Sequence, residues 1–136
     1  MRILVVDDDP QVGQAIRRML RDEDVSTETD PATVVARISS SELEGNPFEL
    51  VLCDFKMRGM SGLEVLSELR GHPESPMLIL MSGYDDLVDA ASIADAIMIK
   101  PCRSHEIRAC IAHVKEMRRR SVTRRIRRMH ATTAEL

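Results

Sequence analysis

The chain has 136 residues, of which 43% are hydrophobic and 30% are charged, and its formal net charge is −3. This length and composition are typical of one globular domain with its own core and exclude a low-complexity chain. The longest aliphatic runs hold about five residues, which excludes a bilayer-spanning helix of ~20 apolar residues.

The small net charge hides an asymmetry along the chain. Residues 1–114 carry 11 Lys and Arg against 20 Asp and Glu, a net charge of −9. Residues 115–136 carry 8 against 2, a net charge of +6. The sequence therefore predicts an acidic body followed by a basic tail.

Short apolar runs alternate with helical patterns along the whole chain. Runs of this kind, ended by polar residues, are typical of strands buried on both faces in a parallel sheet. Proline and serine precede several of the helical patterns, where they favour helix starts. We expect strands at about 3–6, 25–29, 50–54, 77–82 and 96–99, and helices at about 10–20, 31–38, 61–71, 85–93 and from 103 or 104 onward. This order predicts a doubly wound α/β domain with five parallel strands and five helices.

Four of the expected strands end at polar residues that could handle a phosphoryl group. Asp7 and Asp8 follow the first strand, Asp54 ends the third, Ser82 ends the fourth and Lys100 follows the fifth. In open parallel sheets, ligands bind at the carboxyl ends of the strands. The order of these residues therefore predicts one functional site at one edge of the sheet.

These residue types fit a single reaction. Crowded carboxylates are stabilised by a hard cation such as Mg²⁺, which takes oxygen ligands. A carboxylate can also act as a nucleophile and form an aspartyl phosphate. An amine such as Lys100 can neutralise a phosphoryl oxygen, and a hydroxyl such as Ser82 can donate a hydrogen bond to another.

The whole pattern resembles the receiver domain of two-component response regulators, which has the flavodoxin-like topology. The resemblance covers about residues 2–117, and four motifs at strand ends carry it together. They are Val5-Val6-Asp7-Asp8-Asp9-Pro10, Leu52-Cys53-Asp54-Phe55-Lys56-Met57 with Gly59-Met60-Ser61-Gly62, Met81-Ser82-Gly83-Tyr84 and Ile99-Lys100-Pro101.

The resemblance implies a role for the acidic residues. Asp54 would be the phosphoacceptor, and Asp7 and Asp8 would bind Mg²⁺ together with Asp54 and the backbone carbonyl of Lys56. The phosphoryl donor would be a histidine kinase or a histidine phosphotransfer protein. Such a protein is a signalling phosphoacceptor rather than an enzyme, with self-phosphorylation from small donors and slow loss of the phosphoryl group.

The resemblance also implies a role for the residues of the last two strands. Ser82, with Gly83 beside it, would be the phosphate-binding switch position, and Lys100 would contact the phosphate. The Lys100–Pro101 peptide bond would be cis, a form that X–Pro bonds adopt readily.

Four features depart from the family pattern. Ile97 replaces the usual Tyr or Phe, whose ring moves when the switch hydroxyl moves, and Arg58 and Cys102 replace a Pro and a Phe. The segment between Ser82 and Lys100 is also about one helical turn of ~3.6 residues short, so we expect a shortened fourth helix. Phosphate chemistry is expected to be intact and output signalling unusual. The alternative is a phosphorylation-independent interaction module with the receiver fold.

Two other phosphate-handling proteins fit the pattern less well. A haloacid dehalogenase-type phosphohydrolase needs a second Asp two residues after the nucleophile, and Lys56 stands there. An FMN carrier would place its anionic phosphate beside Asp7 and its acidic neighbours, which would repel it.

The domain division follows from this interpretation: residues 1–117 form the receiver and residues 118–136 a basic helical extension or connector. The extension is expected to be a long helix or partner surface. Disorder, contact with nucleic acid or an anionic membrane, and a connector to an output domain of a longer protein remain alternatives. Formation of a homodimer is a further possibility that the sequence leaves open. Three cysteines without C-x-x-C spacing, and no recognisable signal peptide, predict a reduced, cytoplasmic protein.

Overall fold

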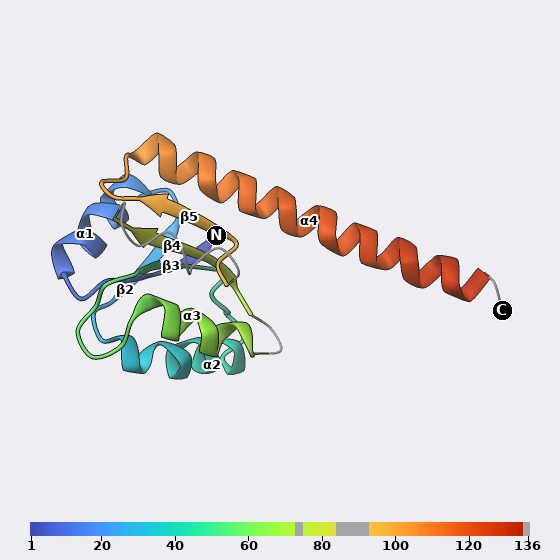
Figure 1. Cartoon of the computed structure of the whole chain (residues 1–136), viewed down its shortest axis with the longest axis horizontal. Helices are drawn as coiled ribbons and strands as arrows, with labels where there is room; N and C mark the ends of the chain where they lie inside the picture. The colour runs from blue at the N-terminus through green and yellow to red at the C-terminus, as the bar shows by residue number, and fades with distance from the viewer. Residues whose placement is uncertain (73–74, 84–92, 135–136) are drawn as a thin grey trace.

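The computed structural model describes residues 1–72, 75–83 and 93–134 (Figure 1). Strands alternate with helices through most of this part of the chain, as the apolar runs predict. In order, the elements are β1 (Arg2–Val6), α1 (Pro10–Met19), β2 (Asp24–Glu28), the 3₁₀ helix η1 (Pro31–Thr33), α2 (Val34–Leu43), β3 (Leu50–Asp54), α3 (Gly62–Arg70), β4 (Met77–Ser82), β5 (Ala96–Ile99) and α4 (Ser104–Ala134).

The five strands form one parallel sheet in the order β2-β1-β3-β4-β5. Every residue of β3 and β4 is buried, because helices cover both faces of the central strands. This confirms the predicted doubly wound α/β architecture. The chain reverses its direction of winding between β1 and β3, and this places the ends of those two strands side by side.

Two apolar clusters pack on opposite faces of the sheet. One cluster joins strand residues to α1 and α4, through residues such as Ile16 and Ile107. The other joins the opposite strand faces to α2 and α3, through residues such as Ile38 and Leu66. Figure 1 shows these helix pairs on the two sides of the sheet. Aliphatic side chains and methionines supply nearly all of this core, as the scarcity of aromatic residues requires.

The helix starts follow local sequence signals. The Asp9 side chain accepts a hydrogen bond from the Gln11 amide and caps α1, whose first residue is Pro10. Ser61 caps α3 by accepting from the Glu64 amide at 3.2 Å. The helix expected from Pro31 starts there, but its first three residues, 31–33, form a 3₁₀ turn before α2 begins.

The described residues contain four α-helices besides η1. The fourth of the five expected helices, at about residues 85–93 and in shortened form, falls on residues 84–92, which lie outside the described ranges. That expectation and the total of five helices stay predictions.

The last helix, α4, continues without a break from Ser104 to Ala134 and extends well beyond the sheet (Figure 1). The tail is therefore helical through residue 134, in line with the expected extension and not with the alternative of disorder. None of the described helices combines the length and apolar character required to cross a membrane.

Candidate functional site

Three carboxylates meet where β1 and β3 end. Asp54 is the last residue of β3, and Asp7 and Asp8 directly follow β1. Asp7 and Asp54 are only 3% and 8% exposed, whereas Asp8 is half-buried. One oxygen atom from each of the three side chains lies within 4.8 Å of the other two. The predicted acidic edge is therefore present as a compact group of ligand atoms.

Lys100 brings a positive charge to the same place from the end of β5. Its Nζ atom lies 2.9 Å from Asp7 Oδ2 and 2.9 Å from Asp54 Oδ1. The Lys100 backbone amide also donates to the carbonyl of Ser82 at 2.8 Å, and the Lys100–Pro101 peptide bond is cis, as expected. One ammonium group thus bridges two buried acids that are far apart in the sequence.

Burial and the neighbouring charges shift the pKa values of both Asp54 and Lys100. Burial is the main cause that raises the pKa of Asp54; the Asp7 and Asp8 charges add to it, while Lys100 acts in the opposite direction. Burial disfavours the Lys100 ammonium, but its hydrogen bonds to Asp7 and Asp54 outweigh this and raise its pKa. The site therefore holds more negative charge than one lysine neutralises, and it favours a further cation.

Backbone amides hold the two aspartates that follow β1. The Asp9 amide donates to Asp7 Oδ1 at 2.9 Å. The Arg58 amide, in the loop after β3, donates to Asp8 Oδ2 at 3.1 Å. Arg58, a departure from the family pattern, therefore retains a backbone N–H that proline would lack. Each carboxylate thus accepts a backbone hydrogen bond through one oxygen atom. The second oxygen atom of Asp7 is the one in contact with Lys100.

Gly62 is a positioning residue to which the sequence motif alone assigned no role. A Cβ atom on Gly62 would overlap the backbone carbonyl of Asp54 and lie 3.0 Å from the Cα atom of Phe55. The Gly62 amide donates to the Phe55 carbonyl at 2.8 Å. The first turn of α3 therefore packs directly on the backbone of the strand end that carries Asp54. The Ser-Gly pair at the start of the helical pattern was the only sequence signal for this contact.

The remaining predicted residues surround this group. Ser82 is 1% exposed at the end of β4, and its hydroxyl donates to the carbonyl of Gly83 at 3.0 Å. Lys56 lies exposed in the loop after β3. Ile97 is half-buried and packs against the core cluster shared with α2 and α3. Asp7, Asp8, Asp54 and Lys100 thus form the centre of the site. Ser82, Gly83, Lys56 and Ile97 lie on the neighbouring strands and loops.

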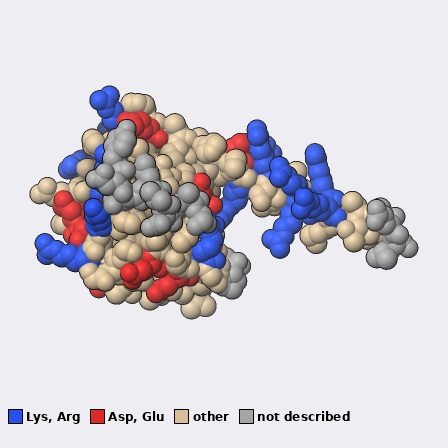
Figure 2. Space-filling model, viewed as in Figure 1, with Lys and Arg blue, Asp and Glu red and all other residues tan. Residues whose placement is uncertain are grey.

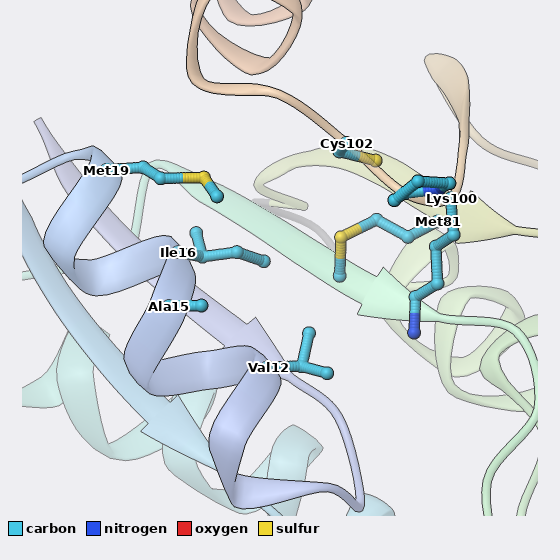
Figure 3. A pocket seen from close by; sticks show the side chains of 8 residues that line it. Val12, Ala15, Ile16, Met19, Met81, Lys100 and Cys102 are labelled. Carbon is cyan, nitrogen blue, oxygen red and sulfur yellow. The ribbon is translucent and has the colours of Figure 1, made fainter.

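An apolar hollow of about 350 Å³ adjoins the site on the α1 side of the sheet. Figure 3 shows side chains of α1 facing Met81 and Cys102 across it. Cys102, which replaces a family phenylalanine, is half-buried here. The lining residues are Val12, Ala15, Ile16, Met19, Met81, Lys100, Pro101 and Cys102.

Comparison with known proteins identifies the family. The family model for the response regulator receiver domain matches residues 3–112. This chain belongs to the response regulator receiver family. The transcriptional regulatory protein AruR of Pseudomonas aeruginosa is 33% identical over an alignment of 125 residues, and the match covers 88% of this chain and 50% of AruR. The chain spans about half the length of the curated relatives it matches.

Solved structures of receiver proteins share the fold. The response regulator TrrA of Thermotoga maritima, in a complex with Mg²⁺–BeF, is 26% identical with a TM-score of 0.68. The match covers 83% of this chain and 97% of TrrA. The structure of TrrA in a complex with the histidine kinase ThkA matches with a TM-score of 0.71 over the same shares, also at 26% identity.

Proposed function

We propose that this receiver domain accepts a phosphoryl group on Asp54 from a histidine kinase or a histidine phosphotransfer protein. The observation that carries the proposal is the Lys100 ammonium, 2.9 Å from both Asp7 and Asp54, inside a group of three carboxylates. A buried nucleophilic acid beside an amine provides the groups that formation of an aspartyl phosphate requires. The kinase complex of TrrA supports a partner of this kind.

In the proposed step, an Asp54 oxygen attacks the phosphorus atom of a phosphohistidine. A P–O bond forms as the P–N bond breaks, and the leaving imidazole keeps the electron pair and takes a proton from solvent. Lys100 already contacts Asp54, so it would neutralise a phosphoryl oxygen without a large movement. The Ser82 hydroxyl would turn from the carbonyl of Gly83 towards a second phosphoryl oxygen.

The donor set fits Mg²⁺. Oxygen atoms of Asp7, Asp8 and Asp54 lie within 4.8 Å of one another, and the backbone carbonyl of Lys56 would be a further ligand. Hard carboxylate oxygens with room for water are the ligands that Mg²⁺ takes. When bound, this cation would neutralise the acids and hold a phosphoryl oxygen. The complex of TrrA with Mg²⁺–BeF supports the assignment.

The test is phosphorylation by acetyl phosphate, with and without Mg²⁺, read by intact mass. We expect one phosphoryl group on the wild-type chain, only with Mg²⁺, and none on Asp54→Asn. Asp9→Asn is the matched control, because Asp9 is exposed and serves as the helix cap of α1, a role that Asn fills well. If Asp54→Asn took up label at the wild-type level, the assignment of Asp54 would be wrong.

Signalling would then depend on protein contacts made by the phosphorylated domain. One observation favours a second candidate function, a constitutive interaction module: Ile97 stands where the family carries an aromatic ring, and it is packed against the core. That candidate predicts equal partner binding by the wild type and by Asp54→Ala. The cytoplasm is the compartment we propose, because all three cysteines are free thiols.

A further inference from the structure

The last part of α4 stands apart from the folded body. Val114 is the last buried residue of this helix, at 2% exposed. One turn later, the Arg118 guanidinium donates to the carbonyls of Ser75 and Pro76 at 3.0 and 3.4 Å. Beyond it the helix projects into solvent, and Figure 2 shows Lys and Arg side chains gathered along it. We call residues 118–128 the arginine arm.

The arginine arm carries an unusual density of positive charge. Glu116 is the only acidic residue of the sequence between positions 107 and 134, and it pairs with Arg119 and Arg120 at 2.7 and 2.9 Å. The arm holds no lysine, and its seven arginines are Arg118, Arg119, Arg120, Arg124, Arg125, Arg127 and Arg128. Within the described ranges, the last four of these make no ion pair. Their charge is therefore available to an anionic partner.

The arrangement of side chains distinguishes between anionic partners. At about 100° per residue, the arginines are distributed round most of the helix. The widest gap between them is about 100°, and the apolar side chains inside it form a strip that spans only about 60°. The strip consists of Val122, Ile126 and Met129, which are 52%, 50% and 64% exposed. A helix that lies in a membrane surface needs a broader apolar face, usually with bulky residues such as Trp, Phe or Leu. An anionic lipid surface is therefore disfavoured.

We propose that the arginine arm binds the phosphate backbone of double-stranded DNA, with the helix in the major groove. An α-helix of ~10–12 Å diameter fits a groove ~12 Å wide, and arginines round most of its circumference can reach both phosphate walls. Guanidinium groups hold phosphate oxygens through paired hydrogen bonds. The major groove of A-form RNA is too narrow, and the arm has no aromatic residue on which single-stranded bases could stack.

The rest of the molecule restricts the contact to the arm. Residues 1–114 carry a net charge of −9, which repels a polyanion over distances up to a Debye length of ~8–10 Å. DNA is therefore expected to approach the arm and avoid the body. Because the proposed contacts are to phosphates, binding carries no sequence preference and depends steeply on salt. This inference does not depend on phosphorylation of Asp54.

The experiment is fluorescence anisotropy of a labelled DNA duplex titrated with the whole chain between 50 and 200 mM salt. If the arm neutralises about five phosphates, affinity should fall about 500-fold over this range, because log K changes by about −0.9 per phosphate for each unit of log salt. A competitor duplex of a different sequence should displace the label equally well.

Matched variants locate the contact. Arg124→Gln/Arg127→Gln/Arg128→Gln removes three charges from the arm, and glutamine preserves helix propensity. We expect at least tenfold weaker binding and a salt slope shallower by about three. The control, Arg17→Gln/Arg18→Gln/Arg21→Gln, removes the same charge from exposed positions on the body and should bind like the wild type. Circular dichroism should show that both variants keep their helices.

Other anionic partners are outcomes of the same test. No binding of DNA at 50 mM salt, or equal losses in the two variants, would overturn the proposal. Tighter binding to an RNA duplex would exclude the major-groove geometry. Binding to phosphatidylserine vesicles without binding to DNA would assign the arm to membranes instead. Val122→Ser/Ile126→Ser/Met129→Ser provides a second measurement, since it should keep DNA binding if phosphates alone are recognised.

Discussion

Substitution of Gly62 by alanine tests how closely the phosphoacceptor strand and the following helix are packed. The new methyl carbon would overlap the carbonyl oxygen of Asp54 and lie 2.9 Å from its carbonyl carbon. Ordinary van der Waals contacts begin at 3.4 Å. The neighbouring atoms belong to the backbone of β3, which is held by a 2.9 Å hydrogen bond from the Phe55 amide to Met81. The strand end or the start of α3 must therefore move by about half an ångström or more.

The expected cost follows from two effects. Overpacking against backbone that cannot yield typically costs about 1–3 kcal/mol. Lengthening the hydrogen bond from the Gly62 amide to the Phe55 carbonyl, 2.8 Å in this structure, would cost about 1 kcal/mol more. The better helix propensity of alanine returns less than about 1 kcal/mol. We expect Gly62→Ala to lower the free energy of unfolding by about 2–3 kcal/mol and to slow phosphorylation of Asp54.

The assay is urea unfolding followed by circular dichroism, together with the rate of labelling by acetyl phosphate. Gly71→Ala is the matched control, because Gly71 follows the same helix with φ of −74° and an added Cβ would meet nothing closer than 3.6 Å. That variant should stay within about 0.5 kcal/mol of the wild type. Equal unfolding free energies for the two variants would refute the packing argument.

Three further predictions concern the site. Because burial raises the pKa of Asp54 above 3.8, its charge destabilises the fold above that pH; Asp54→Asn should therefore unfold at higher urea than the wild type near pH 7 without Mg²⁺. The difference should vanish as the pH falls below 3.8, and a difference independent of pH would contradict this cause. The bulky Lys56 and Tyr84 follow Asp54 and Ser82 by two positions, so the phosphorylated chain with Mg²⁺ should lose its label over minutes or longer; a half-life of seconds by intact mass would count against this. Because an aliphatic Ile97 cannot reproduce the movement of a ring, amide NMR shifts on phosphorylation should stay near the site in the wild type and spread in Ile97→Tyr, and a wide spread in the wild type would show that another residue transmits the change.

The fold was predictable because its strands are short, aliphatic and buried on both faces. Ile3 to Val6 and Leu50 to Cys53 are fully buried, and runs of this kind leave few alternatives to a parallel sheet. Since parallel strands end at one edge, the meeting of Asp7, Asp54 and Lys100 followed from chain order alone. The strand expected at about 25–29 forms at Asp24–Glu28, where only Val25 is buried, and it pairs with β1 along its whole length.

Details that depend on backbone contacts were not predictable. The amide of Arg58 holds Asp8, but any residue other than proline offers the same amide, so the side chain carries no signal. The requirement for glycine at position 62 depends on the approach of a helix to a strand that ends eight positions earlier. The turn at Pro31 is 3₁₀ rather than α, and the energy difference between these two hydrogen-bond patterns in three residues is too small to read from residue type.

The straight course of α4 gives the molecule a mechanical property. Its first residue, Ser104, lies four positions after Lys100, and its last buried residue is Val114. If the helix pivots at Val114, the part from Ser104 to Val114 is about 15 Å long, at 1.5 Å per residue. The part from Val114 to residue 134 is about 30 Å long. A displacement of about 1 Å at the start of α4 would then swing its far end by about 2 Å in the opposite direction. The helix is thus a lever, and its shorter part is attached directly to the loop that follows Lys100, the lysine in contact with Asp7 and Asp54.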